Sequence, residues 1–157
     1  MMAPWNYPFQ LSLSPLLAAI AAGNTVVLKP SELASQSERL ISEIVEKVFA
    51  GQGAVVVTGG VEVAKGLLGE KFDFIFFTGS TAVGREVAEI AGRTLTPSLL
   101  ELGGKCPCVV GPGADLVKSA RRLVAGKLMN AGQTCFAPDF VLVEARVEEE
   151  FRQCLRD

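Results

Sequence analysis

The chain has 157 residues, of which 49% are hydrophobic and 20% are charged, and its formal net charge is −2. This composition excludes a disordered chain, and the slightly acidic balance offers no basic surface to a nucleic acid partner. The sequence contains no histidine, which excludes every catalytic dyad or triad that uses an imidazole as its base.

Helical and strand patterns alternate along the first part of the chain. Ser31 is the expected N-cap of a helix whose apolar residues recur at helical spacing and should face the core. Those residues are Leu40, Ile41, Ile44, Val45, Val48 and Phe49. The other expected elements are helix 10–22, strand 25–28, strand 54–58, helix 61–68, strand 72–77 and helix 80–91. Strands that alternate with helices predict an α/β fold with parallel pairing and right-handed crossovers.

The pattern changes after Gly92, where Thr96-Pro97 interrupts the chain. Extended segments are expected at 99–102, 106–110 and 140–143, with a helix capped by Asp115 and a last helix from Glu148. We therefore expect two domains, 1–97 and 98–157.

Four cysteines stand at positions 106, 108, 135 and 154, without the spacing of metal ligands or the density of a disulfide scaffold. No metal site is expected, and Cys106 and Cys108 are interpreted as reduced core thiols. A reducing compartment, the cytoplasm, is the expected location. The apolar run 16–22 has no preceding lysine or arginine and is short, so neither a signal peptide nor a transmembrane segment is expected.

Two segments carry groups suited to covalent chemistry. Cys135 is a candidate nucleophile that would need backbone N–H groups or a cation for activation, because no histidine exists. Glu101, followed by Gly103-Gly104, is a candidate base with room to move. Each feature alone has an ordinary alternative, an inert buried cysteine or a simple turn. A third segment, Gly79-Ser80, follows a strand and opens a helix, which is a geometry that binds phosphate groups.

Taken in order, five segments resemble the aldehyde dehydrogenase superfamily. They are Pro4–Pro8 (PWNYP), Leu28–Glu32 (LKPSE), Phe77–Gly84 (FTGSTAVG), Glu101 and Cys135. The sequence around Cys135 is most similar to the class 3 branch. The resemblance implies a Rossmann-like parallel sheet with flanking helices in an NAD(P)-binding portion, 1–97. A partial α/β catalytic domain, 98–157, would carry the nucleophile.

The resemblance also implies a reaction, the oxidation of an aldehyde to a carboxylic acid with NAD(P)⁺. Cys135 would attack the aldehyde and pass through a thiohemiacetal and a thioester. Asn6, together with the Cys135 backbone N–H, would stabilise the oxyanion, and Glu101 would activate the hydrolytic water.

Five further residues are assigned to the cofactor by the same resemblance. Lys29 and Glu32 would hold the adenine ribose hydroxyls, Ser80 would contact the pyrophosphate, Gly79 would allow close approach, and Trp5 belongs to the same set. Because the Glu32 carboxylate repels a 2′-phosphate, NAD is favoured over NADP.

The chain is much shorter than a complete protomer of this family, whose members are homo-oligomers, and the resemblance implies that the dimerisation arm is absent. Two alternatives to the dehydrogenase stay open. One is a non-catalytic module that retains part of a nucleotide site. The other is an esterase built from Cys135, Glu101 and Asn6, in which Lys29 and Ser80 would have no role.

Overall fold

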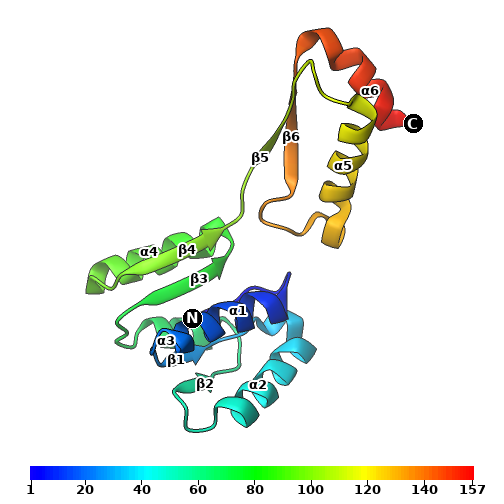
Figure 1. Cartoon of the computed structure of the whole chain (residues 1–157). Helices are drawn as coiled ribbons and strands as arrows, with labels where there is room; N and C mark the ends of the chain where they lie inside the picture. Colours follow the sequence, from blue (N-terminus) through cyan, green and yellow to red (C-terminus); the bar gives the residue numbers. More distant parts are fainter. The chain divides into compact units, whose positions relative to one another are not determined.

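The structure, a computed structural model, describes residues 1–157 and divides into two compact units, Met1–Leu102 and Gly103–Asp157 (Figure 1). Helices and short strands alternate through both units, and every strand pair is parallel. The α/β class and the parallel pairing predicted from the sequence are therefore confirmed. The helices are α1 (Pro8–Ala21), α2 (Ser35–Phe49), α3 (Val61–Leu68), α4 (Thr81–Thr94), α5 (Leu116–Leu128) and α6 (Glu148–Arg156). The strands are β1 (Val26–Leu28), β2 (Ala54–Val56), β3 (Ile75–Gly79), β4 (Ser98–Leu102), β5 (Cys106–Val110) and β6 (Pro138–Val143).

The division between the units falls after β4, because this strand pairs with β3 along its whole length. The boundary expected from the sequence, after residue 97, lies just before β4. The assignment of an NAD(P)-binding portion to 1–97 and a catalytic portion to 98–157 stays a prediction.

In the first unit, the residues Met1–Ala3 lie between β1 and β3 and are called the joining strand. Met2 pairs in parallel with both Lys29 and Phe77. Its carbonyl oxygen accepts a hydrogen bond from the Thr78 N–H at 3.1 Å, while the Lys29 N–H donates to the Met1 carbonyl at 2.9 Å. The order of parallel segments is therefore β2, β1, the joining strand, β3 and β4.

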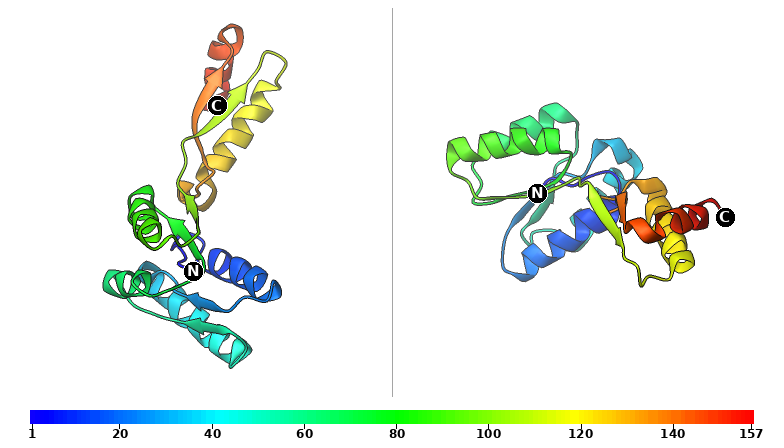
Figure 2. Two further views of the ribbon diagram at one scale, coloured as in Figure 1. Left: turned by 90° about the vertical axis from the view of Figure 1, so that its left-hand side faces the viewer. Right: turned by 90° about the horizontal axis from the view of Figure 1, so that it is seen from above.

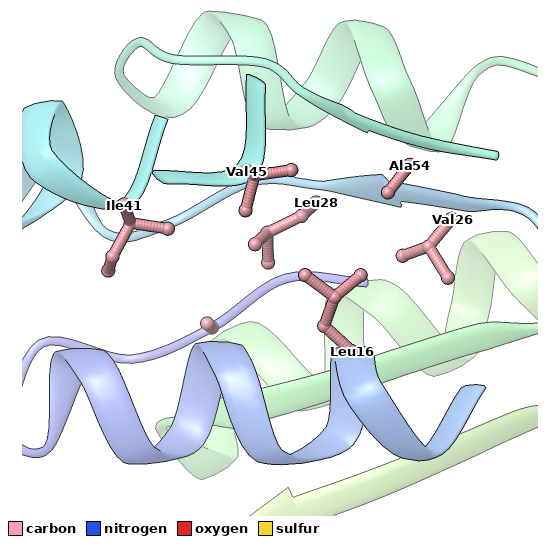
Figure 3. Close-up of a cluster of buried hydrophobic side chains, with 7 residues drawn as sticks. Leu16, Val26, Leu28, Ile41, Val45 and Ala54 are labelled. Atoms are coloured by element: carbon pink, nitrogen blue, oxygen red, sulfur yellow. The ribbon is translucent and has the colours of Figure 1, made fainter. Parts of the chain in front are cut away.

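Two hydrophobic clusters hold the first unit together. In the first cluster, Leu16 of α1, Leu28 of β1 and Val45 of α2 point toward one another and are completely buried (Figure 3). In the second, α4 packs its buried Val87 against β3, and α4 lies along β3 and β4 (Figure 2). The joining strand contributes Met1 and Ala3 to the first cluster and Met2 to the second.

The second unit packs α5 and α6 against the parallel pair β5–β6, and its core is formed by Val110, Leu116, Ala120 and Phe151. The N-cap predicted at Asp115 is confirmed, since its Oδ1 accepts a hydrogen bond from the Lys118 N–H at 3.0 Å. No helix in either unit is both long enough and apolar enough to cross a membrane.

Three local predictions are wrong. Ser31 does not cap α2, because a 3₁₀ turn at Glu32–Ala34 separates them and Ala34 takes the capping position without a side-chain bond. The strand expected at 72–77 is β3, which begins later, at Ile75, and ends later, at Gly79, because these are the residues that pair with β4. The apolar stripe of α2 is only partly buried, since Leu40 and Val48 are exposed.

Candidate active site

The parallel strands of the first unit all end at one edge, called here the carboxyl edge. The chain passes from β1 to Lys29 and Glu32 and from β3 into α4, while Trp5 and Asn6 follow the joining strand. Glu101, the last residue but one of β4, stands opposite Thr78 in the register. Because parallel strands point the same way, their C-terminal ends meet at one edge, where open α/β sheets bind ligands. The predicted residues at this edge are Trp5, Asn6, Lys29, Glu32, Gly79, Ser80 and Glu101.

Lys29 and Glu32 form a close ion pair. Lys29 Nζ lies 2.7 Å from Glu32 Oε2 and also donates to the Pro30 carbonyl oxygen at 3.1 Å. Only 5% of the Lys29 side chain is exposed, compared with 35% of the Glu32 side chain. The hydrogen bond from Lys29 lowers the pKa of the Glu32 carboxyl, and partial burial opposes this shift. The pair therefore presents a fixed carboxylate to solvent.

Gly79 and Ser80 connect β3 to α4, and the backbone of Gly79 is tightly packed. A Cβ atom on Gly79 would lie 2.5 Å from Cζ of the buried Phe77, so only glycine fits without a shift. Ser80 is exposed and caps α4, because its Oγ accepts a hydrogen bond from the Val83 N–H at 3.3 Å. The positive end of the α4 dipole thus lies at the carboxyl edge.

Asn6 and Trp5 precede α1, which begins at Pro8, and Glu101 lies in β4. Asn6 is half-buried, while Trp5 and Glu101 are exposed to solvent. The proline at the first helical position fixes where α1 begins, and so fixes the length of chain between the joining strand and that helix.

Cys135 belongs to the second unit and is exposed. It lies in a turn closed by a hydrogen bond from the Ala137 N–H to the Thr134 carbonyl oxygen at 3.0 Å. Asn130 and Ala131, just before this turn, have positive φ angles of 51° and 56°. Left-handed backbone at residues other than glycine stores strain and is concentrated at functional sites.

Among the predicted residues, the structure brings Lys29 and Glu32 into direct contact and places Asn6, Ser80 and Glu101 at the carboxyl edge of the same unit. It places Cys135 in the other unit. The gathering of the Cys135 sulfur, the Asn6 amide and the Glu101 carboxylate around one substrate stays a prediction.

Two contacts near the predicted residues were missed by the sequence analysis. Glu38, at the start of α2, accepts a hydrogen bond from the Gly59 N–H at 3.1 Å and so fixes the turn after β2 at the carboxyl edge. The Cys106 thiol donates to the Cys135 carbonyl oxygen at 3.5 Å. Cys106 and Cys108, expected as core thiols, are both half-buried and do not form part of the core. Both contacts join residues at least 21 positions apart, so no local signal in the sequence reports them.

A hollow of about 590 Å³ opens at the opposite edge of the first unit, between residues 69–73 and 94–97. It contains none of the predicted residues, and no group of three or more potential metal ligands occurs anywhere in the chain.

The sequence model of the aldehyde dehydrogenase family matches residues 1–157. Aldehyde dehydrogenase family 3 member A2 from Rattus norvegicus is 46% identical over 153 residues, which are 98% of this chain and 32% of that protein. The dimeric NADP-preferring aldehyde dehydrogenase from Mus musculus is 47% identical over 152 residues, 97% of this chain and 34% of that protein.

Among solved structures, the substrate-bound state of Staphylococcus aureus AldH superimposes with a TM-score of 0.92 at 42% identity. The match covers 99% of this chain and 34% of that chain. The chain thus spans about a third of the length of the relatives it matches. The chain therefore belongs to the aldehyde dehydrogenase family, in its class 3 branch, as shown by the order of its motifs, its α/β fold and the match of the family model to residues 1–157.

Proposed function

We propose that this chain carries the principal catalytic groups for the NAD(P)⁺-dependent oxidation of an aldehyde to a carboxylic acid. The observation that carries the proposal is the position of Asn6, Lys29, Ser80 and Glu101 at one edge of a parallel sheet in a member of this family. Cys135 then supplies the thiol that this set of residues lacks.

The residues at the carboxyl edge fit a dinucleotide. The N-terminus of α4 offers backbone N–H groups and a positive dipole to a pyrophosphate, and Gly79 allows the close approach that a Cβ atom would block. The Glu32 carboxylate, held by the buried Lys29, suits ribose hydroxyls. When bound, the nicotinamide ring supplies a hydride acceptor.

The first covalent step is the attack of the Cys135 sulfur on the aldehyde carbon, which gives a thiohemiacetal. The carbonyl oxygen gains negative charge, and the Asn6 side-chain amide and the Cys135 N–H donate hydrogen bonds to it. The loss of one such donor costs about 3–4 kcal/mol of transition-state stabilisation. Asn6 precedes α1 and is half-buried.

Loss of hydride from the former aldehyde carbon leaves a thioester on Cys135. Glu101 takes a proton from water, the resulting hydroxide adds to the thioester, and the carboxylic acid leaves as the thiolate re-forms. Glu101 is exposed, and Gly103 and Gly104 follow it, so its side chain has access to water.

The favoured cofactor is NAD⁺, because a 2′-phosphate would meet the Glu32 carboxylate. The relative from Mus musculus is named as NADP-preferring, which makes this preference a question for direct measurement.

The test compares the 157-residue chain with its Cys135→Ser variant in three assays. The first two measure NADH formation from hexanal or benzaldehyde and hydrolysis of p-nitrophenyl acetate. The third measures the binding of NAD⁺ through the fluorescence of Trp5, the only tryptophan. NADH formation that disappears in the variant supports the dehydrogenase. Ester hydrolysis without NADH formation supports the esterase instead. NAD⁺ binding without either activity supports a non-catalytic nucleotide module, and an absence of all three contradicts the proposed nucleotide site.

A further inference from the structure

In the second unit, the Cys106 thiol contacts the backbone of Cys135. Cys106 Sγ lies 3.5 Å from the carbonyl oxygen of Cys135, and neither residue takes part in a disulfide. Cys135 is exposed and Cys106 is half-buried. We propose that Cys106 is a resolving thiol for Cys135, so that oxidation of Cys135 by a peroxide ends in a reversible Cys106–Cys135 disulfide.

The neighbourhood follows from the pairing of β5 with β6. Cys106 begins β5 and stands opposite Pro138, the first residue of β6, while Cys135 lies in the turn that leads into β6. Gly104 makes the approach possible, because a Cβ atom there would lie 3.1 Å from the Cys135 oxygen and 3.2 Å from the Cys106 sulfur. A larger residue at position 104 would require at least one of these two groups to shift.

The two sulfurs are within reach of each other after a small rearrangement. The Cα–C and C=O bonds together span less than about 2.8 Å, so the Cys106 sulfur lies no farther than about 6 Å from the Cys135 Cα. A cysteine sulfur lies about 3 Å from its own Cα, so rotation of the Cys135 side chain toward Cys106 can bring the two sulfurs within about 3 Å of each other, and movement of the exposed turn closes the rest of the gap to the S–S bond length of about 2.05 Å. The β5–β6 register is irregular between Cys106 and Pro107, and Pro107 has no N–H to hold the ladder there.

The chemistry is balanced with hydrogen peroxide as the oxidant. The Cys135 sulfur attacks one peroxide oxygen, which gives a sulfenic acid and water. The Cys106 sulfur then attacks the sulfenic sulfur, forms the S–S bond and expels the oxygen as a second water. Without a resolving thiol, further peroxide converts the sulfenic acid to sulfinic acid, which thiols do not reverse.

The other two cysteines are separated from Cys135 by the fold and provide controls. Cys108 stands opposite Val141 in the middle of the β5–β6 pair, and Cys154 packs against the core of the second unit from α6. Cys108 lies on the same strand as Cys106 and is equally half-buried, so Cys108→Ser is a matched control for Cys106→Ser.

The test treats the chain and both variants with an excess of hydrogen peroxide over the two equivalents that sulfinic acid formation consumes, blocks the remaining thiols with iodoacetamide, and maps the products by mass spectrometry with and without dithiothreitol. The original chain and Cys108→Ser should lose two hydrogen masses and yield one peptide pair joined through Cys106 and Cys135, which dithiothreitol separates. Cys106→Ser should lack this product and gain two oxygen atoms at Cys135.

Three results overturn the proposal: sulfinic acid at Cys135 to the same extent with and without Cys106, a disulfide from Cys135 to Cys108 or Cys154, or a disulfide between two chains. The identity of the disulfide is read from the original chain, so the second and third results do not depend on whether a variant folds. It also does not depend on aldehyde oxidation, because the readout is the oxidation state of sulfur.

Discussion

The ammonium of Lys29 and the carboxylate of Glu32 are 2.7 Å apart, with the lysine buried and the glutamate reaching solvent. Lys29 directly follows β1, and Glu32 begins the 3₁₀ turn before α2. A buried ammonium needs a partner, so Glu32 stabilises the fold as well as shaping the proposed ribose site.

The first prediction concerns the pH dependence of stability. Because Lys29 lowers the pKa of Glu32 in the folded chain below its ordinary value of 4.5, the stabilisation is complete above that value and is lost as the pH falls through the folded pKa. Urea denaturation between about pH 6 and about pH 3 should show a smaller fall in the free energy of unfolding for Glu32→Gln than for the original chain.

Glu62→Gln is the control for this experiment, because Glu62 forms an exposed pair with Lys65 at 3.5 Å. Exposed pairs contribute little to stability, so this variant should follow the original chain at every pH. An equal fall for Glu32→Gln and the original chain would show that the pair is not coupled to folding.

The second prediction uses Glu32→Gln to test the cofactor preference. Removal of the carboxylate charge should strengthen the binding of NADP⁺ relative to NAD⁺ by about 1 kcal/mol, or about fivefold in the ratio of dissociation constants. Titrations of both nucleotides followed by Trp5 fluorescence would measure this ratio. An unchanged ratio would place the 2′-phosphate away from Glu32.

The third prediction tests the first hydrophobic cluster. Leu28 is completely buried between α1 and α2, whereas Leu33 is 75% exposed. Leu28→Ala should lower the free energy of unfolding by about 2–5 kcal/mol, because it removes buried contacts and leaves a cavity. Leu33→Ala should change it by less than about 0.5 kcal/mol. Urea denaturation followed by far-UV circular dichroism separates these outcomes, and similar values for both variants would contradict the packing of β1.

The fourth prediction compares two glycines that differ in their surroundings. Gly79→Ala should destabilise the chain by about 1–3 kcal/mol, because the added methyl group would overlap the ring of the buried Phe77. Gly92→Ala places the same methyl group inside α4 with no atom within 4 Å, and should stabilise the chain by about 0.5–1 kcal/mol. Thermal denaturation of both variants measures whether each substitution raises or lowers stability. A change in the same direction for both would contradict the tight packing at Gly79.

Local patterns predicted the individual elements better than their connections. The apolar spacing of Val87 and its neighbours predicts the helix that became α4, and Asp115 predicts the start of α5, because each signal lies within a few residues. β3 lies farther along the chain than its aromatic residues suggested, since pairing with β4 decides which residues form the ladder. The exposure of Leu40 on α2 likewise depends on which elements pack nearby.

Residues of the candidate site could be predicted from the sequence only where they stand in a segment similar to a family motif. Lys29, Ser80 and Cys135 stand in segments similar to family motifs, whereas the joining strand has only three residues, too few to show an alternating pattern. The contact of Cys106 with Cys135 spans 29 positions and depends on the pairing of β5 with β6. Such long-range contacts arise from the topology, and no local signal in the sequence reports them.

The alternation of side chains along Met1–Ala3 fixes the register of the joining strand, and with it the positions of the residues that follow this strand at the carboxyl edge. A slip of one position would exchange the layers, so that Met2 entered the cluster built around Leu28 while Met1 and Ala3 faced α4. The same slip would carry Trp5 and Asn6 about 3.3 Å along the strand direction. The packing of Met1, Met2 and Ala3 therefore sets the position of Asn6, the proposed oxyanion donor, along the carboxyl edge.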